Sequence, residues 1–301
     1  MIWILIVGLI LLGLVLLYFG FGYLFLAKFF KRSKKPIKFK DNLSAQYDFS
    51  PDLDWLTRPD IEELTYPWRK KLQRAKLIPY PNSHRYLIGL HGFRGSYAAH
   101  SRIDHRLADA LQANVVLPIF RGDKESDWAY TSLGNKESED LLRWIDVIKK
   151  KDPAASFYVY GVSMGASIAI FASDHYGPEV KTVVADSGFS NLEEQMHDLF
   201  KAKVGPFASF FALPVKLAYQ SRFLIPMDQH TDSALKSTKT PFFFIHGEKD
   251  TFVDPKNFHH HLELDPSPSW FIKDCPHAVG DVVFKDEYYE KVSAFFLRYK
   301  D

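Results

Sequence analysis

The chain has 301 residues, 47% of them hydrophobic and 25% charged, a composition that is typical of a globular protein and excludes intrinsic disorder. Its single cysteine, Cys275, cannot form an intramolecular disulfide, which excludes a disulfide-stapled secreted scaffold. Seven bases and no acid lie in residues 1–40, so residues 41–301 carry a net charge of −5 and lack the basic face that nucleic-acid binding requires.

The chain begins with an apolar stretch, in which no charged side chain occurs from Ile2 to Ala27. As a helix this stretch would be about 39 Å long, more than the ~30 Å hydrocarbon core of a bilayer. A cleaved signal peptide is the alternative, but no basic residue precedes the apolar run, and the run is too long for the apolar region of a signal peptide. The sequence predicts an uncleaved, single-pass membrane anchor over residues 1–27, with glycines that would permit close helix approach at positions 8, 13, 20 and 22.

A cluster of basic residues follows the anchor directly. The positive-inside rule assigns such a cluster to the cytoplasmic side of the membrane. We therefore expect a cell-membrane protein whose body faces the cytoplasm, with an exported body as the alternative. The cluster comprises Lys28, Lys31, Arg32, Lys34, Lys35, Lys38 and Lys40.

Residues 28–80 show weak periodicity despite several aromatic residues and prolines. We expect them to form a basic juxtamembrane tether and an irregular segment that leads into the main domain. No chemistry is predicted for this part of the chain.

Residues 81–301 show short apolar runs that alternate with stretches of helical periodicity. Alternation over two hundred residues predicts an α/β fold, with a doubly wound, mostly parallel sheet. Helical spacing of apolar residues recurs between the runs, as in Ile103, Leu107 and Leu111. The predicted buried strands are Tyr86–Leu90, Val115–Phe120, Phe157–Tyr160, Val180–Ala185, Phe242–Ile245 and Trp270–Ile272.

A G-x-S-x-G motif, Gly161-Val-Ser163-Met-Gly165, lies between a predicted strand and a helical stretch. This is the setting in which a serine occupies a strained turn and exposes its hydroxyl above a sheet. Ser163 is therefore the candidate nucleophile. The backbone N–H of Met164 would lie at a helix N-terminus, where it can stabilise an oxyanion.

A second loop, Leu90-His91-Gly92-Phe93, follows the first predicted strand of the domain. A loop at this place can supply another backbone donor to the oxyanion, and we assign that donor to the N–H of Phe93. For His91 we expect a structural role, in which its ring fixes the loop by hydrogen bonds.

A serine nucleophile needs a base, and the base needs a carboxylate that orients it. Asp250 follows the strand Phe242–Ile245, and His277 follows the next strand, which gives the order Ser, Asp, His that is typical of one class of serine hydrolase. Asp186, at the end of another strand, is the weaker candidate for the acid. The adjacent histidines at positions 259–261 would point in different directions on a helix, so we expect surface residues and no metal site there. Cys275 is expected to serve packing.

Residues 191–235 interrupt the alternation with a helical, phenylalanine-rich pattern, which predicts a helical cap inserted into the domain. We expect this cap to lie over Ser163 and to favour apolar acyl chains. The alternative is that its apolar side chains form only an internal cap core. Two apolar faces carry the argument, one made of Leu192, Met196, Leu199 and Phe200, the other of Phe207, Phe210 and Phe211.

Five motifs occur in the order typical of one family, over residues 84–299. They are L-H-G-F-R-G, G-V-S-M-G-A-S, V-V-A-D-S-G-F-S, I-H-G-E-K-D and P-H-A. The chain thus resembles the α/β-hydrolase superfamily, in particular bacterial membrane-anchored hydrolases of the serine-aminopeptidase and esterase-like group. The resemblance implies the α/β-hydrolase fold, with Ser163 as nucleophile, Asp250 as acid, His277 as base, and Phe93 and Met164 as oxyanion donors.

These observations predict a membrane-anchored serine hydrolase that cleaves a carboxylic ester with an apolar acyl part, without a metal or an organic cofactor. Its substrate would be a small-molecule or lipid-like acyl compound. An aminopeptidase, a thioesterase or an acyltransferase with the same triad are the alternatives, and a non-catalytic binding protein is a more distant one. The oligomeric state is left open by the sequence.

Overall fold

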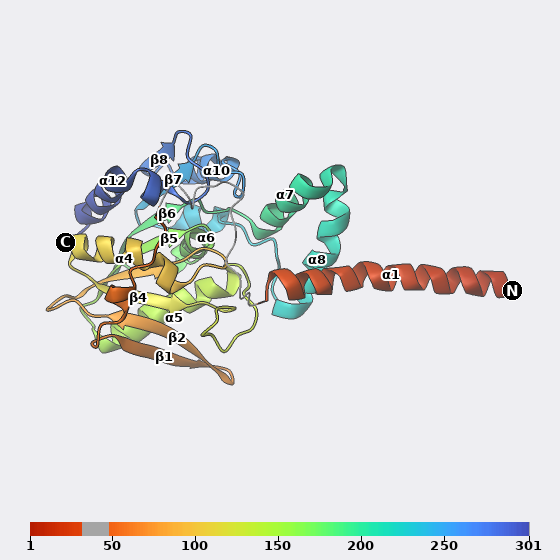
Figure 1. Ribbon diagram of the computed structural model, residues 1–301, viewed down its shortest axis with the longest axis horizontal. Helices are drawn as coiled ribbons and strands as arrows, with labels where there is room; N and C mark the ends of the chain where they lie inside the picture. Colours follow the sequence, from red (N-terminus) through yellow and green to blue (C-terminus); the bar gives the residue numbers. More distant parts are fainter. Residues whose placement is uncertain (32–47, 301) are drawn as a thin grey trace. The chain divides into compact units, whose positions relative to one another are not determined.

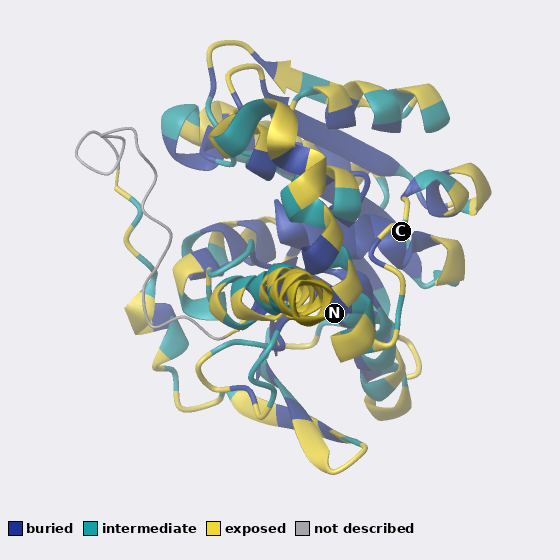
Figure 2. Ribbon diagram, turned by 90° about the vertical axis from the view of Figure 1, so that its right-hand side faces the viewer, coloured by how far each residue is buried: buried dark blue, intermediate teal, exposed yellow. Residues whose placement is uncertain are grey.

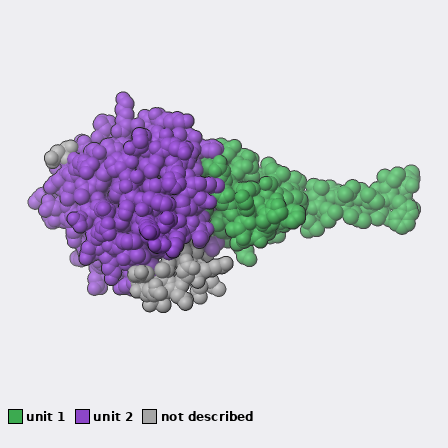
Figure 3. Space-filling model, turned by 90° about the horizontal axis from the view of Figure 1, so that it is seen from above, with its two compact units in different colours: residues 1–31, 191–229 green, residues 32–190, 230–301 purple. Residues whose placement is uncertain are grey.

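The computed structural model describes residues 1–31 and 48–300. The chain divides into two compact units, which Figure 3 distinguishes by colour: Met1–Lys31 with Asn191–Gln229, and Arg32–Ser190 with His230–Asp301. The inserted segment thus groups with the N-terminal helix. Five of the seven predicted juxtamembrane bases, from Arg32 to Lys40, lie outside the described residues.

The larger unit, which we call the body, is built on an eight-stranded sheet in the order β1-β2-β4-β3-β5-β6-β7-β8 (Figure 1). The strands from β4 through β3 to β8 pair in parallel, whereas β1 and β2 form an antiparallel hairpin that adds to β4. Strand bounds are β1 Glu62–Trp68, β2 Lys71–Ile78, β3 Arg85–Leu90, β4 Asn114–Ile119, β5 Ser156–Val162, β6 Val180–Asp186, β7 Phe242–Gly247 and β8 Ser269–Ile272.

The six strands predicted from apolar runs are confirmed as β3 to β8. The residues of β4 and β7 are buried throughout, as expected for strands that helices cover on both faces. Parallel pairing aligns Val162 with Asp186 and Asp186 with Ile245, so three strands end at nearly the same level. This edge of the sheet is where open α/β sheets usually place their sites.

The expectation of an irregular segment before residue 81 is wrong for residues 62–78, which form the β1–β2 hairpin. On β2 only alternate positions are buried at first, and they hold Gln73 and Ala75 before Leu77. Because a polar and a small residue occupy this inner face, the period-two pattern of the strand is weak in the sequence.

Helices flank the sheet of the body. Helix α4 packs with α12 over one hydrophobic core cluster, which includes Leu107, Tyr160 and Tyr288, while α5 packs with α6. Ser96 caps α4 by accepting a hydrogen bond from the Ala99 N–H at 3.1 Å. Helix bounds are α3 Leu53–Leu56, α4 Tyr97–Leu111, α5 Asn135–Lys151, α6 Met164–Phe171, η1 Ser173–His175, α9 Asp232–Ser237, α10 Lys256–Leu264, α11 Gly280–Val283 and α12 Lys285–Arg298.

The smaller unit, which we call the anchor unit, consists of α1 Ile2–Phe29, α7 Leu192–Val204, the short 3-10 turn η2 Gly205–Phe207 and α8 Ala208–Phe223. Within the described residues, α1 is long and apolar enough to cross a membrane, a test that a signal sequence would also pass. Most of α1 is exposed (Figure 2). The predicted helical character of the insertion is confirmed, and Pro214 lies inside α8 without ending it.

Candidate active site

Ser163 lies at the turn between β5 and α6, at the carboxyl edge of the sheet. Its backbone has φ 56° and ψ −118°, a conformation that is costly for any residue with a side chain. The turn is held from both sides, because the Ser163 N–H donates to the Asp186 carbonyl at 2.7 Å and the Ser167 N–H donates to the Ser163 carbonyl at 3.1 Å. The predicted strained turn is thus present, and Met164 is the first residue of the helix that follows.

Gly165, the glycine that follows Ser163 in the motif, is required because the backbone of β3 approaches it closely. A Cβ atom on Gly165 would lie 1.9 Å from the carbonyl oxygen of Leu90, the last residue of β3. The first turn of α6 therefore packs directly on the end of the neighbouring strand. A side chain at position 165 would push the helix, and Ser163 with it, out of place.

Ser163, His277 and Asp250 are hydrogen-bonded in series. His277 Nε2 lies 2.9 Å from Ser163 Oγ, and His277 Nδ1 lies 2.6 Å from Asp250 Oδ2. All three residues are buried, with exposed fractions of 5–6%. The fold thus brings together residues that are 114 and 27 positions apart in the sequence. With Nδ1–H donating to the carboxylate, Nε2 is free to accept the serine proton.

The carboxylate of Asp250 is held in a fixed orientation. Its Oδ1 atom accepts hydrogen bonds from the N–H groups of Phe252 and Val253, both at 2.9 Å. Its Oδ2 atom faces His277 and also lies 3.2 Å from His246 Nε2. Burial alone would raise the pKa of Asp250, but the charge of His277 and the hydrogen bonds from His246 and His277 hold that pKa well below its usual range. Asp250 is therefore ionised at neutral pH.

The sequence did not assign a role to His246, which contacts Asp250 in the structure. His246 is 1% exposed and its Nε2 atom is also 3.0 Å from the Val253 carbonyl, so the ring supports both the carboxylate and the loop that carries it. Its place at the end of β7, four residues before Asp250, is the signal that points to this contact.

Asp186, the alternative acid, lies in different surroundings. Its carboxylate accepts hydrogen bonds from the Tyr288 hydroxyl at 2.6 Å and from the Ser187 hydroxyl at 2.8 Å. Burial raises the pKa of Asp186, in contrast to the lowered pKa of Asp250. His277 is thus paired with the ionised carboxylate.

The loop after β3, which carries Phe93, lies against Ser163. A Cβ atom on Gly92 would be 3.3 Å from Ser163 Cβ and 3.8 Å from its Oγ. The loop is fixed by His91, which is buried and whose Nδ1 and Nε2 atoms lie 2.9 Å from the Gly92 carbonyl and 3.0 Å from Asp123 Oδ2. The peptide between Gly92 and Phe93 is therefore held beside the serine, as an oxyanion donor requires.

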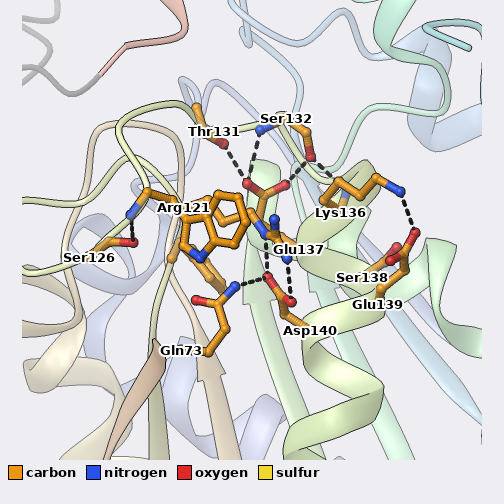
Figure 4. Close-up of polar contacts among 12 residues, drawn as sticks. Gln73, Arg121, Ser126, Thr131, Ser132, Lys136, Glu137, Ser138, Glu139 and Asp140 are labelled. Atoms are coloured by element: carbon orange, nitrogen blue, oxygen red, sulfur yellow. Dashed lines mark hydrogen bonds and ion pairs between the residues drawn. The ribbon is translucent and has the colours of Figure 1, made fainter. Parts of the chain in front are cut away.

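Two carboxylates of α5 hold the loop after β4 (Figure 4). Asp123, which contacts His91, lies on the same loop. Asp140 forms a bidentate ion pair with the buried Arg121, at 2.6 and 2.8 Å. Glu137 accepts hydrogen bonds from the Thr131 hydroxyl and the Ser132 N–H, at 2.9 and 3.0 Å. A buried, fully paired network of this kind rigidifies the loop and, through Asp123, the oxyanion side of the site.

The remaining candidates have structural surroundings. Burial raises the pKa of the Cys275 thiol to about 12, which leaves it protonated and unreactive at neutral pH. The expectation of three surface histidines is wrong for His261, which is 3% exposed and stacks on Phe244, whereas His259 is exposed. Among residues 1–31 and 48–300, no cluster of His, Cys, Asp and Glu is arranged for a metal ion.

Comparison with known proteins finds folds of the α/β class described above. A family model described as the alpha/beta hydrolase fold matches residues 86–212. The esterase Pf2001 of Pyrococcus furiosus is 21% identical, with 90% of this chain and 100% of that chain covered and a TM-score of 0.66. Est1E of Butyrivibrio proteoclasticus is 16% identical (78% and 98% covered, TM-score 0.57), and a meta-cleavage product hydrolase of Pseudomonas fluorescens IP01 is 17% identical (80% and 99%, TM-score 0.53).

The chain therefore has the α/β-hydrolase fold that the motifs implied. No curated protein matches the chain in sequence. The family model and the neighbours support the prediction of an enzyme, a hydrolase.

Proposed function

We propose that the protein is a membrane-anchored serine hydrolase that cleaves a carboxylic ester through an acyl-enzyme. Ser163 is the nucleophile, His277 the general base and Asp250 the acid that orients the base. The backbone N–H groups of Phe93 and Met164 stabilise the oxyanion. The observation that carries the proposal is the continuous series of hydrogen bonds from Ser163 Oγ through the His277 ring to Asp250 Oδ2, at 2.9 and 2.6 Å.

The reaction follows from these contacts. His277 Nε2 accepts the proton of the Ser163 hydroxyl as Oγ attacks the ester carbonyl, and the ionised Asp250 stabilises the imidazolium that forms. The tetrahedral oxyanion is bound by the two backbone N–H groups, and its collapse expels the alcohol, which takes the proton from His277. Water, activated by the same histidine, then releases the acyl group and restores the serine.

The substrate class is supported by the surroundings and by the neighbours. The ring of Phe252 packs beside the imidazole of His277, with centroids 5.1 Å apart, which gives the site an apolar side. One neighbour of known structure is described as an esterase, and another, Est1E, was solved with ferulic acid bound. We therefore favour an ester with an apolar acyl part, from a small molecule or a lipid.

The membrane location is proposed from α1 and the charges that follow it. The helix is about 42 Å long at 1.5 Å per residue, which exceeds the ~30 Å hydrocarbon core. Basic residues from Lys28 to Lys40 place the body on the cytoplasmic side under the positive-inside rule. Protease added to intact cells should leave a cytoplasmic body uncut until the membrane is permeabilised, and rapid cutting without permeabilisation would contradict the orientation.

A fluorophosphonate probe tests the nucleophile directly, since it reacts with an activated serine and needs no knowledge of the substrate. The full chain should be labelled, Ser163→Ala should not, and the exposed Ser233→Ala should be labelled like the unmodified protein. Ester turnover should fall on the order of 10⁶-fold in Ser163→Ala if chemistry limits the rate. Labelling that persists in Ser163→Ala would refute the assignment. A panel of ester, thioester and aminoacyl substrates then separates the esterase from its alternatives.

A further inference from the structure

In the anchor unit, the C-terminal half of α1 packs along α8. Ring centroids of Tyr18 and Phe210 are 4.6 Å apart, and those of Phe30 and Tyr219 are 5.6 Å apart. The Tyr18 hydroxyl also donates a hydrogen bond to the Phe210 carbonyl at 2.8 Å. Tyr18, earlier in the chain than Phe30, contacts Phe210, which is earlier than Tyr219. The two helices therefore run in the same direction, and these contacts fix their register.

Gly22 permits this contact. A Cβ atom on Gly22 would lie 2.0 Å from the carbonyl oxygen of Pro214, so the two backbones touch at this point. Of the predicted glycines, 8, 13 and 20 have no such neighbour within 4 Å. The expected close helix approach therefore occurs within the chain, between α1 and α8.

The register sets the depth of α8 in a bilayer that α1 spans. The part of α1 that precedes the contact, residues 2–17, is about 24 Å long at 1.5 Å per residue. The hydrocarbon core is ~30 Å thick, so about four further residues of α1, from Tyr18 to Phe21, must still lie within it. Tyr18 and Phe21 are the residues that contact Phe210 and Phe211. The beginning of α8 is thus at the depth of the acyl chains.

A row of apolar side chains along η2 and α8 is left largely uncovered by α1 and α7. Its large side chains are more than 40% exposed, with values of 66% for Phe207 and 57% for Phe210. Their spacing puts those on α8 along one face of the helix. Soluble proteins rarely leave a row of this kind uncovered. The row, which we call the α8 apolar face, consists of Phe207, Phe210, Leu213, Leu217 and Leu224.

The charges around this face suit a membrane surface. Residues 199–227 contain no acid and four bases, Lys201, Lys203, Lys216 and Arg222. Lys201 and Lys203 are exposed and precede Phe207 closely in the chain. Lysines beside an inserted apolar segment are attracted to anionic lipid headgroups.

We propose that η2 and the α8 apolar face are inserted into the lipid bilayer, in the leaflet that the C-terminal half of α1 crosses. The inference rests on the proposed membrane anchor, and its occupant is the acyl chains of that leaflet. Phe207 and Phe210 are the deepest residues, and α8 rises from them, so that Leu224 lies near the level of Phe30, beyond the edge of the hydrocarbon core. The insertion is then a membrane-embedded element, which accounts for side chains that neither an internal core nor the rest of the anchor unit covers.

Depth-dependent fluorescence quenching tests this placement on the full chain. Single cysteines labelled with an environment-sensitive dye (NBD) are introduced by Phe207→Cys, Leu213→Cys, Leu224→Cys, Leu12→Cys and Glu263→Cys, while the buried Cys275 stays in place and unlabelled. Each variant is reconstituted in vesicles of phosphatidylcholine and phosphatidylglycerol that contain doxyl-labelled lipid. Labelling by the fluorophosphonate probe verifies that the body of each variant has folded, and a helix content by circular dichroism equal to that of the unmodified chain verifies the anchor unit.

We expect at least threefold stronger quenching at positions 207 and 213 than at 263, which is exposed in the body, and an intermediate value at 224. Quenching at both 207 and 213 that equals the value at 263, while position 12 is strongly quenched, would overturn the inference and leave the anchor intact. Absence of quenching at position 12 would instead refute the anchor, and the inference with it.

Discussion

The two units of the molecule place the same type of residue in opposite surroundings. In the body, phenylalanines such as Phe242, Phe244 and Phe296 are at most 1% exposed and form the layers between sheet and helices. In the anchor unit, Phe207 and Phe210 are more than half exposed. The body thus buries these apolar side chains in its own core, whereas the anchor unit leaves Phe207 and Phe210 largely exposed. This difference shows that the burial of the phenylalanines, and not their number, distinguishes the two units.

Polar groups show the same contrast. The body buries its polar and charged groups in pairs and networks, such as Arg121 with Asp140 and His277 with Asp250. In the anchor unit, α1 contains no charged residue before Lys28, and its polar contacts to α8 come from Tyr18 and Tyr23, whose hydroxyls bond to the Phe210 carbonyl and to Ser221. A rigid polar site is therefore expected only in the body, and each prediction below perturbs one of the two units.

The largest effect is expected from the acid of the site. Asp250→Asn keeps the shape of the side chain but removes the charge that stabilises the His277 imidazolium, and ester turnover should fall on the order of 10⁴-fold. Asp186→Asn is the matched control, because Asp186 bonds to Tyr288 and Ser187 and should affect turnover far less. Steady-state kinetics on a short soluble ester measures both. The reverse ranking would transfer the role of the acid to Asp186.

The close approach at Gly165 predicts the next largest effect. A methyl group there overlaps the Leu90 carbonyl at 1.9 Å, and because backbone cannot yield as a side chain does, Gly165→Ala should destabilise the body by about 3 kcal/mol or more. Gly13→Ala, where nothing lies within 4 Å, serves as the control. Urea unfolding monitored by tryptophan fluorescence measures the change. Equal stability of both variants would mean that the turn at Ser163 relaxes freely.

Much of the fold and of the site follows from the sequence, because both depend on local patterns. Continuous apolar runs marked the strands β3 to β8, although the edge strand β8 buries only Ile272, and the strand-to-helix setting of Ser163 marked the strained turn. Asp250 and His277 were found because each follows a strand whose carboxyl end lies at one edge of the sheet. The structure brings these three residues together as that reasoning expected.

The parts that the sequence did not predict depend on long-range contacts. The β1–β2 hairpin was not predicted because a polar residue, Gln73, faces inward on β2. Its amide donates a hydrogen bond to Asp140, 67 residues away, at 2.7 Å. His261 was expected at the surface because three adjacent histidines look polar, yet the helix turns one of them toward Phe244. The pairing of Gly22 with Pro214 likewise joins segments that no local pattern connects.

A pH-dependent effect in the body is expected from His261. Burial, with help from the charges of His260 and His246, lowers the pKa of His261 to about 3, against about 6.5 in an unfolded chain. Between these values the unfolded state binds the extra proton, so the free energy of unfolding falls as pH decreases, by about 1.4 kcal/mol per unit from this group. His261→Phe should flatten urea-unfolding stability between pH 6.5 and 5, and the exposed His259→Phe should not. Parallel slopes for His261→Phe and the unmodified chain would exclude His261 as the cause.

The smallest effect is expected in the anchor unit, where Gly22→Leu forces α8 away from α1. A side chain at this position overlaps the Pro214 backbone, and overpacking of this kind costs about 1–3 kcal/mol. The α7–α8 segment should then open more often, and trypsin should cut it on the order of 10-fold faster at its four basic residues, of which Lys201, Lys203 and Arg222 are exposed. Gly13→Leu adds the same side chain to α1 where nothing lies within 4 Å, and it should leave the cleavage rate unchanged.

The same pair of variants examines whether the two units are independent. Phosphonate labelling of Ser163 depends on contacts made within the body, from β3, β5 and the loops that carry Asp250 and His277. Gly22→Leu should therefore change trypsin sensitivity while the labelling rate stays within about twofold of the unmodified chain. Loss of labelling in parallel with faster cleavage would show that the anchor unit supports the geometry of the site. In that case the body would not be independent of the other unit, because the position of Ser163 would depend on how α8 packs.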